Sequence, residues 1–111
     1  MPINEALAEY LELYHKGEAN AITSWELECA FGVRGKDLRD AVNGLRRQGV
    51  PIASNGNGYF YAATEQEVRA TIAHMTHRIS GIAAAIRGLS RSLERFDTAQ
   101  TRLPLEGGGG P

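Results

Sequence analysis

Apolar residues in the first half of the chain recur at helical spacing in three segments. Residues 3–16 and 35–48 each carry one continuous apolar stripe, so both are predicted to be amphipathic helices. Between them, Thr23 is followed three residues later by Glu26, which is typical of a helix-capping box. The pattern therefore predicts a second helix, running from residue 24 to a glycine at residue 32.

Two short segments rich in β-branched and aromatic residues follow, at 50–54 and 59–62. The Asn-Gly repeat of residues 55–58 lies between them, and Asn-Gly pairs favour tight hairpin turns because both residues tolerate positive φ. Pro51 lacks an N–H, so the first strand is predicted to begin late. Residues 21–22 are a candidate for a further short strand beside this hairpin.

The last third of the chain carries an uninterrupted heptad pattern. Thr64 and Glu67 again have capping-box spacing, and the pattern predicts a helix over 64–97, about 50 Å long. Its apolar positions alternate at spacings of four and three, which is typical of a coiled coil: Val68, Ile72, Met75, Ile79, Ile82, Ile86, Leu89, Leu93 and Phe96. Residues 98–111 lose this pattern, end in glycines and a proline, and are predicted to form a flexible tail.

An apolar seam of this length is more than a small domain can cover. We therefore expect self-association through residues 64–97. A homodimer is the simplest assembly. A tetramer is the alternative, because isoleucine occupies both kinds of seam position. The opposing interpretation is a helix folded back on its own domain.

Composition narrows the class of protein. The 111 residues suit one domain plus an appended element, and we place the domain at 1–63. One cysteine, Cys29, excludes an intrachain disulfide framework. No apolar run reaches the roughly 20 residues of a membrane span, and no signal peptide is evident, so a cytoplasmic protein without membrane contact is expected.

Charge is unevenly distributed along the chain, although the formal net charge is only −1. Residues 1–31 carry −5, residues 32–59 carry +3, and residues 60–111 carry +1. Because the local sign decides whether a surface meets phosphate, the middle segment is the candidate for contact with nucleic acid.

The order of helix, strand, two helices and hairpin, together with specific residues, resembles a winged helix-turn-helix of the biotin-repressor and DeoR type. The resemblance covers residues 3–62. It rests on three segments: the first motif helix and its glycine turn (26–33), the recognition helix and the entry to the wing (38–52), and the Gly-Tyr return of the wing (58–61). It implies a mainly α fold with a small β-hairpin wing, and a function in DNA binding.

A recognition helix in the major groove offers its exposed stripe to base edges. We expect Lys36 and Arg39 to bind guanine and Asn43 to bind adenine. Asp40 lies on the same stripe and either accepts a hydrogen bond from cytosine or orients Arg39. The remaining candidates are assigned to phosphate or to backbone at the wing tip: Arg34, Arg46, Arg47, Asn55 and Asn57.

The function expected is that of a non-enzymatic DNA-binding protein, a small transcriptional regulator whose partners are double-stranded DNA and itself. The alternative is a protein-interaction or phage or replication accessory module, which recruits a protein partner. No cofactor or metal is expected. His74 and His77 are interpreted as solvated, Cys29 as a core thiol, and Trp25 as a packing residue of its helix.

Overall fold

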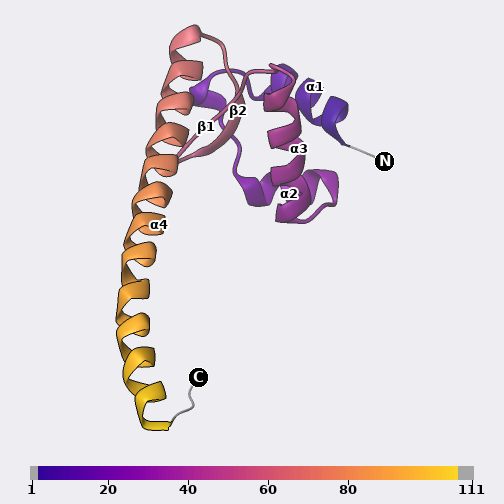
Figure 1. Ribbon diagram of the computed structural model, residues 1–111. Coiled ribbons are helices and arrows are strands. Elements are labelled where there is room, and N and C mark those ends of the chain that lie inside the picture. Colours follow the sequence, from indigo (N-terminus) through magenta and orange to yellow (C-terminus); the bar gives the residue numbers. More distant parts are fainter. Residues whose placement is uncertain (1–2, 108–111) are drawn as a thin grey trace. The chain divides into compact units, whose positions relative to one another are not determined.

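The computed structural model describes the backbone of residues 3–107 and the side chains of residues 3–96. The chain is mainly helical, with one two-stranded antiparallel hairpin and a long C-terminal helix (Figure 1). It divides into two units, Met1–His74 and Met75–Pro111, and each is described by itself.

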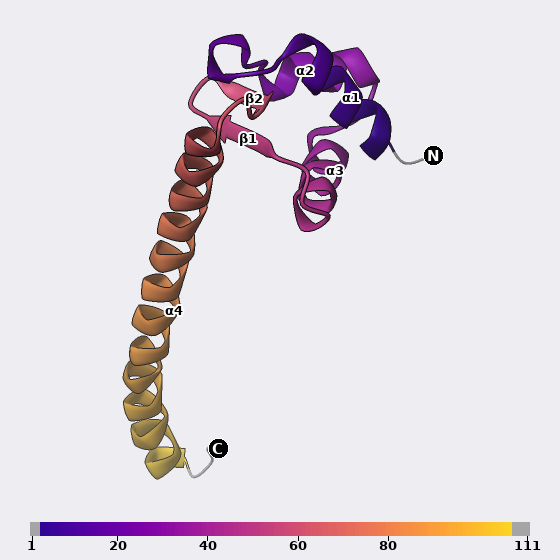
Figure 2. The same cartoon turned by 90° about the horizontal axis from the view of Figure 1, so that it is seen from above.

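Three helices and a short 3₁₀ turn form most of the first unit. They are α1 (Asn4–Tyr14), η1 (Glu18–Asn20), α2 (Ser24–Phe31) and α3 (Gly35–Arg47). Helix α3 lies beside both α1 and α2 (Figures 1 and 2). Their apolar faces meet in one core with two residues from the connecting segments: Leu7, Leu11, Leu27, Leu38, Ala41, Val42 and Leu45, with Ile22 and Ile52.

The capping signals predicted for α2 are confirmed. The Glu26 N–H donates to Thr23 Oγ1 at 3.1 Å, and the Thr23 N–H donates back to Glu26 Oε1 at 3.2 Å. The helix ends at Gly32, whose φ of 64° lies in the left-handed region that glycine adopts without strain. Three residues, Gly32, Val33 and Arg34, separate α2 from α3, so a short turn joins the two helices.

The hairpin consists of β1 (Ile52–Asn55) and β2 (Gly58–Tyr61), paired from Ile52 with Tyr61 to Asn55 with Gly58. The first strand begins directly after Pro51, as predicted. Residues 21–22 contribute a single bridge instead of a strand: Ile22 exchanges two backbone hydrogen bonds with Tyr59, at 2.9 and 2.8 Å.

In the hairpin, the glycine with positive φ is not the one that the Asn-Gly signal suggests. Its turn lies at Gly56 and Asn57, and neither residue has positive φ. The positive φ, 130°, is at Gly58, where a Cβ atom would lie only 2.1 Å from the Ile22 carbonyl oxygen. Gly58 therefore permits the close approach of the Ile22 segment to β2.

Helix α4 (Glu65–Gly107) begins as the capping box predicts, with the Glu67 N–H donating to Thr64 Oγ1 at 3.2 Å. The carboxylate of Glu67 accepts backbone N–H groups from Glu18 at 3.0 Å, Ala63 at 2.6 Å and Thr64 at 3.3 Å. These bonds, led by that from Glu18, hold the pKa of Glu67 below its ordinary 4.5. Glu67 thus fastens η1 to the start of α4.

The first turns of α4 also pack on the hairpin. Val68 lies against a small buried cluster formed by Ala53, Phe60 and Ala62. Thr71 is buried, and its hydroxyl accepts the Ser54 N–H at 3.2 Å. The start of the long helix is therefore an integral part of the first unit.

The far end of α4 differs from the heptad-based boundary. The pattern predicts a helix that ends at residue 97, whereas the helical backbone continues to Gly107. The predicted flexible tail covers residues 98–111. The side chains of these residues are not among those that the structure describes, and for 108–111 the backbone is not described either. Among the described residues, no helix is long and apolar enough to cross a bilayer.

Candidate nucleic-acid interface

One face of α3 is buried in the core, and the opposite face is exposed and rich in cations. Arg39, Asn43 and Arg47 follow one another at four-residue spacing on this exposed face. Successive members of such a row rise by about 6 Å along the helix axis. The row therefore offers two guanidinium groups and one carboxamide, all donors that suit base edges or phosphates.

Lys36 begins this surface but carries a partner within the helix. Its Nζ lies 3.1 Å from Asp40 Oδ2, and both side chains are mostly exposed. Ion pairs this exposed contribute little to stability and exchange readily, so Lys36 remains available to an anion. Asp40 is placed beside Lys36, which makes it the local counter-ion of the lysine.

Arg34 precedes α3 and occupies the capping position without making a side-chain cap. The first turn of α3 therefore presents backbone N–H groups without a side-chain acceptor from that position. The exposed guanidinium of Arg34 lies next to them in the chain. Asp37 in the first turn places one negative charge at this helix N-terminus, and Arg34 adds an exposed cation beside it.

Arg46 differs from the other candidate cations because it is half-buried and bonded within the unit. Its Nε donates to the Ile52 carbonyl at 2.8 Å, and its Nη2 donates to Ser54 Oγ at 3.2 Å. The sequence assigns Arg46 to phosphate, but these bonds fasten α3 to β1. Ser54, which sequence analysis did not single out, completes this connection.

The hairpin tip carries amides but no cation. The Asn57 N–H donates to Asn55 Oδ1 at 2.8 Å. Asn57 is exposed and Asn55 is half-buried. No lysine or arginine occurs between residues 48 and 68. The tip can therefore offer hydrogen bonds to a partner, but no charge.

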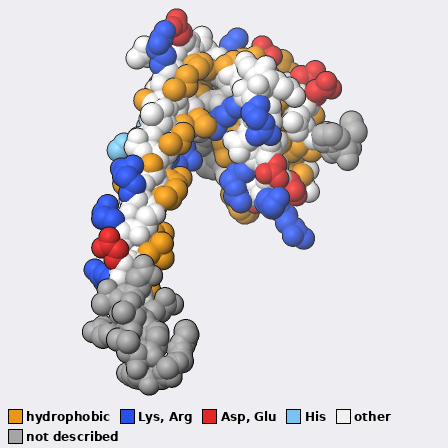
Figure 3. All heavy atoms as spheres, viewed as in Figure 1, with side chains coloured by type: hydrophobic (Ala, Val, Ile, Leu, Met, Phe, Trp, Pro, Cys, Tyr) orange, Lys and Arg blue, Asp and Glu red, His pale blue; other side chains and the backbone are white. Residues whose placement is uncertain are grey.

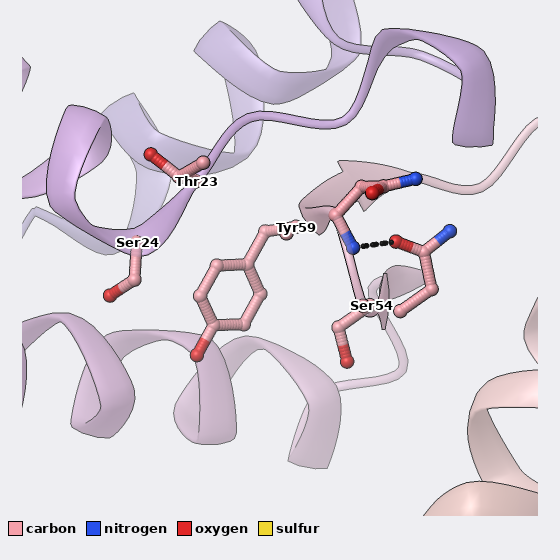
Figure 4. A pocket seen from close by; sticks show the side chains of 8 residues that line it. Thr23, Ser24, Ser54 and Tyr59 are labelled. Atoms are coloured by element: carbon pink, nitrogen blue, oxygen red, sulfur yellow. Dashed lines mark hydrogen bonds between the residues drawn. The ribbon is translucent and has the colours of Figure 1, made fainter.

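An open hollow of about 340 Å³ lies between the hairpin tip and the start of α2. The ring of Tyr59 lies between Ser24 and Ser54 at its floor (Figure 4). Its lining residues provide hydroxyl, amide and backbone groups: Thr23, Ser24, Ser54, Asn55, Gly56, Asn57, Gly58 and Tyr59. The hollow is therefore equipped for hydrogen bonding with a polar ligand.

Two sequence-based interpretations on α2 are wrong. Cys29 is exposed instead of buried in the core, and Trp25 is 71% exposed instead of packed. Both border a second open hollow, of about 480 Å³, which also reaches Arg34 and Asp37 at the start of α3. The helical period places both residues on the outer face of α2, away from buried Leu27.

Helix α4 presents a continuous apolar stripe. Val68 and Met75 are half-buried, but the later seam side chains are 56% to 69% exposed: Ile72, Ile79, Ile82, Ile86, Leu89, Leu93 and Phe96. Figure 3 shows this stripe on one side of the helix, with charged side chains on the opposite side. His74 and His77 are exposed, and the described residues contain no cluster of three or more metal-ligating side chains.

Figure 3 also shows cationic side chains gathered over α3, with acidic groups among them. Comparison of the chain with protein-family models, with curated proteins and with solved structures finds no match. The candidate interface therefore rests on the geometry and charge of its own residues.

Proposed function

We propose that residues 3–62 are a winged helix that binds double-stranded DNA, with α3 in the major groove, and that the protein self-associates through α4. The observation that carries the proposal is the exposed row of Arg39, Asn43 and Arg47 on a helix whose other face is anchored in the core. A rigid helix with projecting donors has the dimensions to enter a major groove.

The proposed roles of the interface residues are supported by their exposure and their local contacts. Arg39 and Asn43 are the base-reading residues, and Lys36 joins them after exchanging Asp40 for a DNA acceptor. Arg34 and Arg47 bind phosphate at the two ends of α3. Asn55 and Asn57 contribute uncharged contacts at the wing tip, and Arg46 acts from within by holding α3 on β1.

Self-association is supported by the exposed seam of α4. A large apolar stripe in contact with water is costly, and a second copy of the same stripe is the partner of matching shape and length. Most positions that flank the seam are small or uncharged, so the apolar face is wide: Thr71, Ala83, Ala85, Ser90 and Ser92. A wide face of this kind suits a dimer or a tetramer, and in either assembly the DNA-binding units are joined.

The protein is accordingly proposed to act without catalysis, as a small transcriptional regulator. A second candidate function, recruitment of a protein by a phage or replication accessory module, is favoured by exposed Trp25 beside its hollow on α2. Exposed tryptophans are frequent anchors of protein interfaces. This hollow reaches Arg34 and Asp37 at the start of α3, but its lining does not include Arg39, Asn43 or Arg47 of the exposed row.

Equilibrium binding to a duplex of random sequence tests whether the protein binds double-stranded DNA. If each protomer neutralises about four phosphates, log affinity falls with log salt with a slope near −3.6 per bound protomer. Alanine at Trp25 serves as the control, since it removes the candidate protein anchor and leaves the cations of α3 intact. Undetectable binding to every duplex at low salt would overturn DNA binding and favour the recruitment function.

A further inference from the structure

Thr71 on α4 is the one buried polar side chain among the described side chains of residues 3–96. A buried hydroxyl is costly unless it is hydrogen-bonded, and this hydroxyl both accepts and donates. It accepts the backbone N–H of Ser54 at 3.2 Å, and it donates to the backbone carbonyl of Glu67 at 3.1 Å. Thr71 lies beyond residue 62, so it is outside the segment that resembles a winged helix.

Ser54 meets Thr71 at the outer edge of β1. Ser54 pairs with Tyr59 across the hairpin, but the Tyr59 N–H donates to Ile22, away from β1. The Ser54 N–H correspondingly donates away from β2, to Thr71. Strand β1 lies beside the first turns of α4 in both ribbon views (Figures 1 and 2). The hydroxyl of Thr71 therefore takes the place that a third strand would have, since a buried N–H needs an acceptor.

The same serine is bonded to α3. Nη2 of Arg46 donates to Ser54 Oγ at 3.2 Å, and Nε of Arg46 donates to the Ile52 carbonyl at 2.8 Å. Strand β1 is thus joined to α3 by Arg46 and to α4 by Thr71. Apolar contacts are non-directional, whereas hydrogen bonds have a preferred geometry and fix a register. These bonds consequently fix how α3 is set against the hairpin, and Arg47 of the exposed row is the next residue along α3.

We propose that Thr71 is a positioning residue for DNA recognition, which acts through Ser54 and Arg46 on the exposed row of α3. The inference rests on the proposed function and extends it, because the unit that recognises DNA then includes the first turns of α4 as well as residues 3–62. Thr71 contacts neither base nor phosphate in this proposal. Its loss should therefore reduce the preference for one sequence without reducing the charge-dependent affinity for bulk DNA.

Thr71→Val and Thr71→Ser test the role of the hydroxyl. Valine has the shape of threonine but cannot accept the Ser54 N–H, whereas serine keeps the hydroxyl and loses only the methyl group. The quantity measured is the affinity of the full-length protein for its selected duplex divided by its affinity for bulk DNA, at a temperature where each variant is folded. In Thr71→Val this ratio should fall by about 5-fold or more, equivalent to about 1 kcal/mol, with the parental salt slope. Thr71→Ser should keep most of the parental ratio.

Three further variants locate the effect. Thr76→Val makes the same change at an exposed threonine of α4 and should keep the parental ratio. Arg46→Ala should lower the ratio by itself, and Thr71→Val should add less than about 2-fold in that background, because both changes interrupt one route. Ser54→Ala interrupts the route at its middle, so it provides the same comparison should Thr71→Val fail to fold.

A folded Thr71→Val or Ser54→Ala protein with the parental ratio would overturn the inference. An equal fall in Thr71→Ser would also overturn it, because the effect would then come from lost packing. A fall in Thr71→Val that adds fully to that of Arg46→Ala would exclude the route through Ser54. These results leave the proposed function intact as long as Arg39→Ala relaxes the parental preference. A parent protein without any sequence preference would instead contradict recognition by α3, and the inference would fail with it.

Discussion

Arg46 on α3 donates a hydrogen bond to the hydroxyl of Ser54 on β1, at 3.2 Å. The Ser54 N–H in turn donates to the hydroxyl of buried Thr71 on α4, at 3.2 Å. One serine thus joins the proposed recognition helix to the first turns of the long helix. Cations on the same helix consequently have different roles, and substitution can separate them.

Replacing Arg46 with alanine should destabilise the first unit by about 1–3 kcal/mol, because hydrogen bonds from a charged group to Ile52 and Ser54 are lost. Arg47→Ala, at an exposed neighbouring position, should change stability by less than about 0.5 kcal/mol. Urea unfolding measures both. Equal stability of the two variants would contradict the structural role of Arg46.

Replacing Gly58 with alanine should destabilise the hairpin by more than about 2 kcal/mol, since φ is 130° and a Cβ would meet the Ile22 carbonyl oxygen at 2.1 Å. Gly56→Ala is the matched control, because a Cβ at that turn position meets nothing within 4 Å. Thermal unfolding of the two variants should separate them clearly. A neutral Gly58→Ala would show that the Ile22 segment does not approach β2 so closely.

Glu67 should make stability depend on pH. Its pKa is lowered in the folded protein by backbone N–H groups, above all that of Glu18, so its ionised form is stabilised by folding. This contribution is present above the unfolded pKa, near 4.5, and is lost as pH falls through the lower folded value. Glu67→Gln should therefore be less stable than the parent at neutral pH, and the difference should shrink below about pH 4.5.

Unfolding curves between pH 3 and 7 provide that comparison. Glu65→Gln is the control, since the carboxylate of Glu65 pairs with the exposed side chain of Arg69 instead of with backbone N–H groups. A constant difference between the parent and Glu67→Gln across this range would be inconsistent with the network at the start of α4.

A glutamate at Ile79 or Ile86 should dissociate the assembly, because the seam would bury an unpaired charge. The first unit should remain folded, since its core lies within residues 3–74. Ala84→Glu, outside the seam on the same helix, should leave the assembly intact. Sedimentation at micromolar concentration distinguishes these cases, and a 12.0 kDa monomer for the parent chain would exclude self-association.

The sequence predicts the elements of this fold closely because its signals are local. Thr23 with Glu26 and Thr64 with Glu67 make the capping boxes that their spacing implies. The role of Arg46 could not be predicted in this way, because its acceptors, Ile52 and Ser54, lie across a turn whose geometry no periodicity encodes. The role of Gly58 could not be predicted from local signals either, because the Ile22 segment whose close approach it permits is far away in the chain.

The candidate site is predictable in part, because helical periodicity is also a local signal. Helical periodicity places Arg39, Asn43 and Arg47 on the exposed face of α3, because the buried face is marked by apolar residues. The exposure of Trp25 and Cys29 was missed because α2 is short, and its apolar residues do not mark one face unambiguously. Leu27 is the only residue of α2 that is fully buried.

Recognition of DNA by α3 requires that the protein prefer one DNA sequence over others. The decisive measurement is selection of bound duplexes from random DNA, followed by competition of the selected sequence against bulk DNA, for the parent and for Arg39→Ala and Asn43→Ala. We predict one enriched sequence, and a loss of about 1–3 kcal/mol in each variant with relaxed preference at a single position. Enrichment of no sequence, or a preference unchanged in both variants, would contradict recognition by α3.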